Sequence, residues 1–96
     1  MRESRIENRL TRRLKNAGWL SLKFISPGNA GVPDRLLISP EGRVIFAELK
    51  TETGRLSPTQ KAQIQRLRKY RQDVRVLYGA EDVDALLNEI EGSGAD

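Results

Sequence analysis

The segment Arg43–Lys50, with the sequence RVIFAELK, constrains the fold of this 96-residue chain more than any other feature. Successive side chains of a β-strand alternate between its two faces, so one face of this segment carries Val, Phe, Glu and Lys while the other carries Arg, Ile, Ala and Leu. Both faces are apolar from residue 44 to residue 47, which predicts a strand buried on both sides. The strand then ends in Glu48 and Lys50 on one face. Charges at the end of a buried strand must be paired, bound to a metal or placed at the edge of a cleft.

Apolar periodicity and turn residues predict six further elements around this strand. The expected order is a helix at about 3–16, strands at 19–25, 35–38 and 43–50, a helix that begins at 57–58, a strand at 74–78 and a helix at 81–91. The strands at 35–38 and 43–50 form a hairpin, whereas a helix joins 43–50 to 74–78 and favours a parallel pair with a right-handed crossover. The order α-β-β-β-α-β-α is therefore an α/β architecture, with a mixed central sheet of about four strands flanked by helices.

Apolar stripes on the three helices identify the expected core. The first helix contributes Ile6, Leu10, Leu14 and Ala17, the second Ile64, Leu67 and Tyr70, and the third Val83, Leu86, Leu87 and Ile90. Gly18 supplies the left-handed residue that ends the first helix. The second helix opens with several signals together: Ser57 at the N-cap, Pro58 at the first helical position and Gln60 three residues after the cap.

The length allows one domain, expected at residues 1–91, with a flexible tail at 92–96. A chain this short buries only about 60–65% of the surface that its unfolded form exposes, so dimerisation is an expected source of further stability. No apolar stretch approaches the roughly 20 residues that span a bilayer, and the N-terminus lacks the apolar core of a signal peptide. We therefore expect a soluble, intracellular protein without membrane contact.

The chain contains no cysteine and no histidine. These absences exclude disulfides, thiolate metal sites, histidine-based zinc sites and nucleophile pairs of the Ser-His or Cys-His kind. Any catalysis has to use carboxylates, lysine, amides, hydroxyls and a hard metal ion bound through oxygen.

The net charge of +4 is distributed unevenly. Residues 1–23 contain seven Lys/Arg and two Glu, whereas residues 79–96 contain six acidic residues and no basic one. A basic body with an acidic last helix is consistent with a surface that binds a polyanion such as nucleic acid.

Asp34 precedes the strand at 35–38 and follows a glycine-rich loop and a proline. If this strand pairs with 43–50 as a hairpin, Asp34 comes near Glu48 and Lys50 at one edge of the sheet. Two carboxylates, with the backbone carbonyl of Leu49, can hold Mg²⁺ or Mn²⁺, and the ion would polarise a phosphate and acidify a bound water. Lys50 would orient or deprotonate that water, or stabilise developing charge. Each motif also has an ordinary interpretation: Asp34 as a turn residue, and Glu48-Leu49-Lys50 as part of a strand that alternates toward solvent. The prediction of a metal site therefore depends on the two motifs lying together.

Three segments occur in a characteristic order: Gly31-Val32-Pro33-Asp34, then Glu48-Leu49-Lys50 after the hairpin, then Gly54-Arg55-Leu56-Ser57-Pro58-Thr59-Gln60. This pattern resembles the VRR-NUC (virus-type replication–repair nuclease) family of the PD-(D/E)XK superfamily, and the resemblance extends from residue 7 to about residue 87. It implies a restriction-endonuclease-like fold in which Asp34 and Glu48 bind the metal. It further implies that Lys50 is the catalytic lysine and that Gln60 belongs to the active site. Glu7 matches an acidic residue of the first helix in this superfamily and is a further candidate ligand.

The same resemblance implies a substrate. Small members of the family are similar in build to the Holliday-junction resolvases, which act as homodimers. The expected activity is therefore that of an Mg²⁺-dependent endodeoxyribonuclease on four-way junctions or other branched DNA, with no small-molecule substrate. A bacterial or phage-encoded enzyme of this kind would act in the cytoplasm. Phosphate contacts would come from Arg5, Arg9, Lys23 and Arg55.

Three alternatives stay open on the sequence. One is a nicking or restriction-like nuclease without junction preference, another is a nucleic-acid-binding module that does not cut, and the third is a small dimeric interaction protein. The complete set of Asp34, Glu48 and Lys50 argues against the second, because a degenerate module is expected to lose at least one of them. Gln60 also has a structural interpretation in the capping box of Ser57, and the default interpretation of Glu7 is a salt bridge to an arginine.

Overall fold

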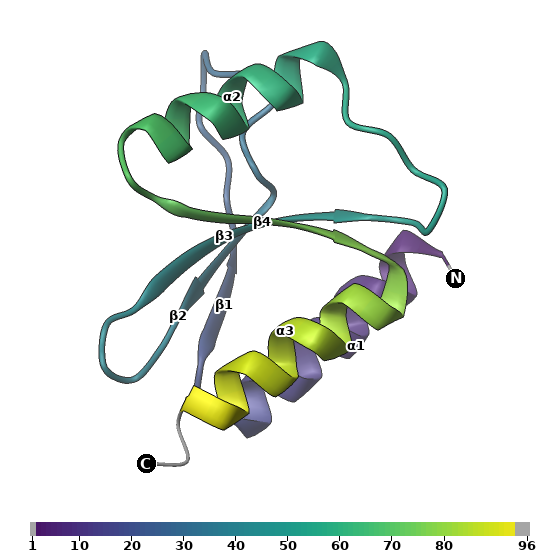
Figure 1. Ribbon diagram of the computed structural model, residues 1–96, viewed down its shortest axis with the longest axis vertical. Coiled ribbons are helices and arrows are strands. Elements are labelled where there is room, and N and C mark those ends of the chain that lie inside the picture. Colours follow the sequence, from purple (N-terminus) through teal and green to yellow (C-terminus); the bar gives the residue numbers. More distant parts are fainter. Residues whose placement is uncertain (1, 94–96) are drawn as a thin grey trace.

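A computed structural model describes residues 2–93 of the chain as seven elements (Figure 1). They are α1 (Glu3–Asn16), β1 (Leu20–Lys23), β2 (Arg35–Ile38), β3 (Val44–Lys50), α2 (Pro58–Lys69), β4 (Asp73–Tyr78) and α3 (Gly79–Ser93), which confirms the expected order. β1 is shorter than expected, and α3 includes residues 92 and 93 of the expected tail; residues 94–96 lie outside the described part. Within residues 2–93, no helix has the length and apolar character that crossing a bilayer requires.

The four strands form one mixed sheet in the order β1-β2-β3-β4. β2 pairs antiparallel with β1 and with β3, while β3 pairs parallel with β4, so both the hairpin and the parallel pair are confirmed. The register places Arg35 beside Ala47, and β3 continues beyond this pair to Lys50. The last residues of β3 therefore run past the beginning of β2, next to the segment that enters it.

One face of the sheet is covered by α1 and α3, which lie side by side (Figure 1). The main core lies between these helices and the sheet, and its members are Ile6, Leu10, Leu14, Trp19, Leu37, Ile45, Ala47, Leu49, Leu77, Val83, Leu86, Leu87 and Ile90. Burying one such aliphatic side chain contributes roughly 1.5–3 kcal/mol. The expectation for Ala17 was wrong: it is exposed, because it is the C-cap of α1 and Gly18, at φ +82°, turns the chain away from the helix.

The other face is covered by α2 over β3 and β4. The expected capping box is confirmed: the backbone N–H of Gln60 donates to the Ser57 hydroxyl at 3.1 Å, and the backbone N–H of Ser57 donates to the Gln60 side-chain oxygen at 2.8 Å. Ile64 is buried, as is Val74 on this face of β4. The expectation for Tyr70 was wrong, because it follows the last residue of α2 and is 70% exposed.

The half of this face formed by β1 and β2 is open. The register places Leu20 and Leu22 on the same face as Phe46, and these two leucines are 57% and 46% exposed. Val44, on the same face of β3, is 37% exposed. α2 packs on β4 and ends at Lys69, so it leaves β1 uncovered. The sheet thus has one closed face and one face that is closed over only half of its width.

Candidate active site

The candidate site lies where β3 runs past the beginning of β2. Asp34 enters the sheet one residue before the Arg35–Ala47 pair, which places it opposite Glu48. The backbone N–H of Leu49 lowers the pKa of the Asp34 carboxyl, and the backbone N–H of Asp34 lowers that of Glu48, so each N–H faces the acidic side chain of the neighbouring strand. The hairpin therefore brings Asp34 close to Glu48, as expected from the sequence.

The ionised forms of the two carboxylates are destabilised in the folded protein. Burial raises the pKa of Asp34 to about 6, against the lowering effect of the Leu49 N–H. Burial, together with the negative charge of Asp34, raises the pKa of Glu48 to about 7, and the Lys50 ammonium opposes this shift. The Oδ1 atom of Asp34 is buried and has no hydrogen-bond partner. A cation between the two carboxylates would reduce the repulsion of their negative charges and would compensate for the water that each loses on burial.

Gln60 joins the helix cap to this carboxylate pair. Its side-chain oxygen accepts from the backbone N–H of Ser57 at 2.8 Å, and its Nε2 atom donates to Oε2 of Glu48 at 3.3 Å. The amide therefore satisfies the cap and contacts Glu48 at the same time. The structural and the functional interpretations of Gln60 are both compatible with this geometry, and the N-terminus of α2 is directed to the site.

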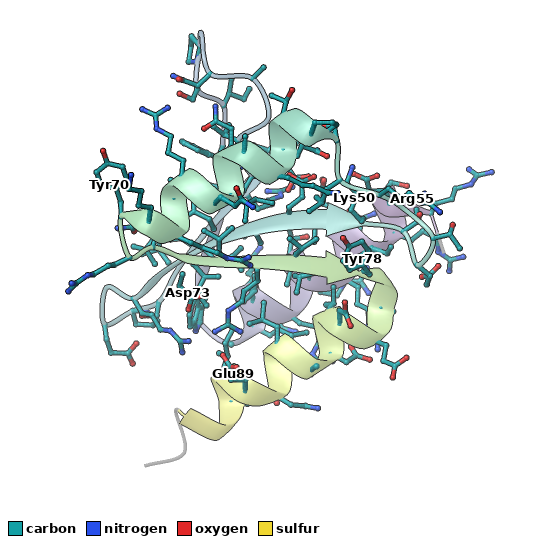
Figure 2. All side chains as sticks on the ribbon, turned by 45° about the horizontal axis from the view of Figure 1, so that its top comes forward. Lys50, Arg55, Tyr70, Asp73, Tyr78 and Glu89 are labelled. Atoms are coloured by element: carbon teal, nitrogen blue, oxygen red, sulfur yellow. The ribbon has the colours of Figure 1, made fainter. Side chains whose placement is uncertain are left out.

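Lys50 lies on the Glu48 face of β3. A Cβ atom on Gly54 would approach the Cβ and Cδ atoms of Lys50 to 3.2 and 3.3 Å, so the loop after β3 packs against the aliphatic stem of this lysine. Figure 2 shows Lys50 at the end of β3, close to this loop. Asp34, Glu48, Lys50 and Gln60 thus meet at one end of the sheet.

Arg35 is a residue near the site that the sequence did not identify. Its side chain is only 10% exposed and forms an ion pair with Oε1 of Glu7 at 2.8 Å, which connects α1 to β2. The arginine partner expected by default for Glu7 is therefore present. Glu7 remains near Asp34, because its charge is among the smaller causes that raise the pKa of that carboxyl. A link between residues so far apart in sequence has no local signature.

The four cations expected to contact DNA differ in their surroundings. Arg9 is bound through two nitrogen atoms to Asp84 of α3, at 2.8 and 2.9 Å, so its guanidinium is already engaged. Arg5 is exposed and lines a hollow between α1 and residues 51–53. Lys23 is exposed at the end of β1, and Arg55 is exposed in the loop before α2.

Within residues 2–93 there is no cluster of three or more Asp, Glu, His or Cys side chains that would hold a metal ion. Asp34 and Glu48 form a pair, which is enough for Mg²⁺, because this ion keeps several waters and takes substrate oxygens as ligands. In an antiparallel pair the N–H and C=O of one residue point to the same neighbouring strand. Since the Leu49 N–H points to Asp34, its carbonyl faces the same space. The residues present therefore fit a small oxygen-liganded dication.

Comparison with known proteins shows to which family the chain belongs. The sequence model of the VRR-NUC domain family matches residues 2–81. The chain belongs to the VRR-NUC family. A solved VRR-NUC domain with 32% sequence identity superposes with a TM-score of 0.84, over 90% of this chain and 94% of the other. A second solved VRR-NUC domain protein, with 19% identity and a TM-score of 0.65 over 92% of this chain and 86% of the other, shares the fold.

A curated relative has a name that describes an activity. "Putative nuclease p44" of Acyrthosiphon pisum secondary endosymbiont phage 1 is 42% identical over 60 residues, which are 62% of this chain. The aligned part is 64% of the relative's length, so this VRR-NUC chain matches just under two thirds of it. The family and the restriction-endonuclease-like arrangement expected from the sequence are thus confirmed.

Proposed function

We propose that this VRR-NUC domain hydrolyses phosphodiester bonds of DNA and requires a divalent cation. The observation that carries the proposal is the pair Asp34 and Glu48, which the β2–β3 hairpin brings together although burial raises the pKa of both. Carboxylates whose pKa values are strongly shifted are typical of catalytic sites. The name of the phage relative supports a nuclease.

Asp34, Glu48 and the carbonyl of Leu49 would hold the ion, which is Mg²⁺ by ligand type with Mn²⁺ as a substitute. When bound, the ion supplies positive charge that polarises the phosphate and activates water. The unpartnered Oδ1 of Asp34 supports this assignment. Arg35 engages Oε1 of Glu7, so a contribution of Glu7 to the ion would come through its other oxygen.

Lys50 would act on the reacting groups directly, whereas Gln60 would act through Glu48 and the start of α2 through its N–H groups. Lys50, on the same strand face as Glu48, donates to the scissile phosphate or orients the attacking water, and its positive charge stabilises the negative charge that develops. Gln60 fixes the Glu48 carboxylate through its Nε2 atom. The first N–H groups of α2 favour an anion at this position, which suits a phosphate.

We further propose that the active unit is a homodimer that acts on branched DNA. The open half of the α2 face, around Leu20, Leu22 and Val44, presents aliphatic side chains to solvent. Because a two-fold interface brings the same patch of both subunits together, an apolar patch can pair with itself, whereas a patch of one charge cannot. Two active sites on one dimer would suit a substrate with two equivalent strands, such as a four-way junction.

The test is a cleavage assay on labelled four-way junction, flap, linear duplex and single strand, each with Mg²⁺, with Mn²⁺ and with chelator. We expect metal-dependent, symmetric cuts in the junction, and a loss of about 10²–10⁴-fold in rate for Lys50→Ala with DNA binding retained. Equal cutting of all substrates would keep the nuclease and refute the junction preference. Cleavage that survives in chelator, or unchanged in Lys50→Ala, would refute the proposed site.

A further inference from the structure

A hollow lies beside the catalytic end of β3, on the side of β4. It has a volume of about 410 Å³ and is lined by residues 52–56, by Lys61 of α2 and by Tyr78 at the end of β4. Figure 2 shows Lys50, Arg55 and Tyr78 at this same end of the molecule, on β3, on the loop and on β4. The register pairs Lys50 with Tyr78, so the hollow begins one strand away from the proposed catalytic lysine.

The walls of this hollow are tightly packed. Gly79 has a φ of +78°, and a Cβ atom there would lie 2.6 Å from Cγ of Glu52. At Gly54 a Cβ atom would lie 3.2 Å from Cβ of Lys50. The loop at 51–57 is therefore pressed against the end of β3 and the start of α3. Because two glycines allow this close approach, the fold itself forms the hollow before any ligand arrives.

Two cations at the hollow are available to a ligand. Arg55 and Lys61 are exposed, and within residues 2–93 neither side chain has a hydrogen bond or an ion pair. Other arginines of the chain are engaged: Arg9 and Arg13 pair with α3, and Arg43 and Arg75 pair with Asp73 and Glu89. The carboxylate of Glu52 also lines the hollow but packs over Gly79. Two free cations against one carboxylate favour an anionic ligand.

Tyr78 adds an aromatic wall. Its ring is half-buried on the strand face of Lys50, and the adjacent strands are about 4.8 Å apart. Lys50 in turn lies two residues, about 6.6 Å, beyond Glu48 along β3. Tyr78 thus lies about one strand spacing from the lysine that would contact the cleaved phosphate. Single-stranded nucleic acid is commonly bound by cations that contact the backbone next to aromatic rings that contact bases.

We propose that this hollow is a subsite for the nucleotide next to the cleaved bond, in which Arg55 and Lys61 bind its phosphate and Tyr78 contacts its base. The subsite rests on the proposed nuclease function, since it is defined relative to the cleaved phosphate. It places the substrate strand across the loop at 51–57, from Glu48 past Lys50 toward β4. The proposal thereby defines the path of the substrate strand over the sheet.

The test neutralises one substrate phosphate at a time with a methylphosphonate, on either side of the cleaved bond. With the wild-type domain, neutralising the neighbouring phosphate on one side should raise KM about tenfold, while kcat changes less than twofold. In Arg55→Gln/Lys61→Gln, KM should already be raised about 10–100-fold on the unmodified substrate, and the same methylphosphonate should add nothing. The salt dependence of binding should also become shallower in this variant.

Lys69→Gln is the matched control, because it removes an exposed cation at the opposite end of α2 and should leave KM within twofold. Tyr78→Phe should behave as wild type, whereas Tyr78→Ala should raise KM about fivefold, and an abasic nucleotide at that position should cancel the difference. Equal methylphosphonate sensitivity in the wild type and the double variant would overturn the subsite. If the wild type cuts no substrate, the nuclease proposal fails, and DNA binding then tests the subsite by itself. Equal DNA affinity of the double variant and of Lys69→Gln would overturn the subsite. A tenfold weaker affinity of the double variant would support it.

Discussion

The two faces of the sheet are built for different purposes from the same strands. On the α1/α3 face, Ile45, Ala47 and Leu49 of β3 have no exposed surface. On the α2 face, the same strand carries Val44, which is 37% exposed, and then Glu48 and Lys50. The strand alternates between the two environments at every residue. One face therefore provides stability, and the other carries groups that are unfavourable in the folded state unless a ligand or a partner compensates them.

This difference explains how so small a domain can hold a strained site. The raised pKa values of Asp34 and Glu48 mean that their ionised forms oppose folding near neutral pH. The closed face offsets that opposition with a continuous apolar core between the sheet and the helices α1 and α3. Truncating an apolar side chain of the closed face and removing a charge from the carboxylate pair should consequently change the free energy of unfolding in opposite directions, and this can be measured.

The largest change in stability is expected for Leu49→Ala. Leu49 is fully buried on the closed face, and truncating it should lower the free energy of unfolding by about 2–5 kcal/mol because it removes apolar contacts and leaves a cavity. The matched control is Leu22→Ala on the open half, where the leucine is 46% exposed and the loss should stay below about 1 kcal/mol. Urea unfolding of both variants gives the comparison. A similar loss for the two leucines would mean that the open half is covered after all.

An effect of the opposite sign is expected for Glu48→Gln. The pKa of Glu48 is raised to about 7 and that of Asp34 to about 6, above the values of an unfolded chain. Protons are therefore bound more tightly in the folded state, and this contribution to stability is complete below about pH 4 and is lost as pH rises through 6–7. In chelator at pH 8, the variant should be more stable than the wild type by about 1–2 kcal/mol.

The measurement is urea unfolding at pH 5 and pH 8 in chelator. The wild type should lose stability between these values, and the variant should lose less. Three other acidic residues with shifted pKa values do not interfere with this measurement: Asp73, Asp84 and Glu89. Arginine partners lower their pKa values, so their contribution to the free energy of unfolding is lost only in stronger acid. Added Mg²⁺ should stabilise the wild type at pH 8 more than the variant. A wild type whose stability is flat from pH 5 to pH 8 would contradict the strain argument.

The sequence predicted those features that depend on local periodicity. The alternation in β3 gave both its buried face and the position of Glu48 and Lys50, and the capping box of Ser57 follows from residues three apart. Helix ends were less predictable: Ala17 and Tyr70 continue the apolar spacing but lie just beyond the helices, where the chain has already turned. Periodicity counts apolar residues and does not show where a helix stops.

Long-range partners were the second limit. The pair Glu7–Arg35 and the pair Arg9–Asp84 each join distant elements, so the sequence could not show that Arg35 is buried or that Arg9 is already occupied. The exposure of Leu20 and Leu22 was hidden for a related reason. An alternating strand shows which residues share a face, but coverage of that face depends on where α2 ends relative to β1.

The smallest effect on the folded monomer is expected for Leu22→Glu, although its effect on association should be large. The side chain is already half in solvent, so the free energy of unfolding of the monomer should change by no more than about 0.5 kcal/mol. In the proposed homodimer the same substitution places two like charges at one two-fold interface, and the dissociation constant should rise at least tenfold in sedimentation equilibrium. Gln65→Glu, which adds the same charge at an exposed position of α2, is the control. If both variants associate like the wild type, the open half of the sheet is not the dimer interface, and its exposed leucines need another partner.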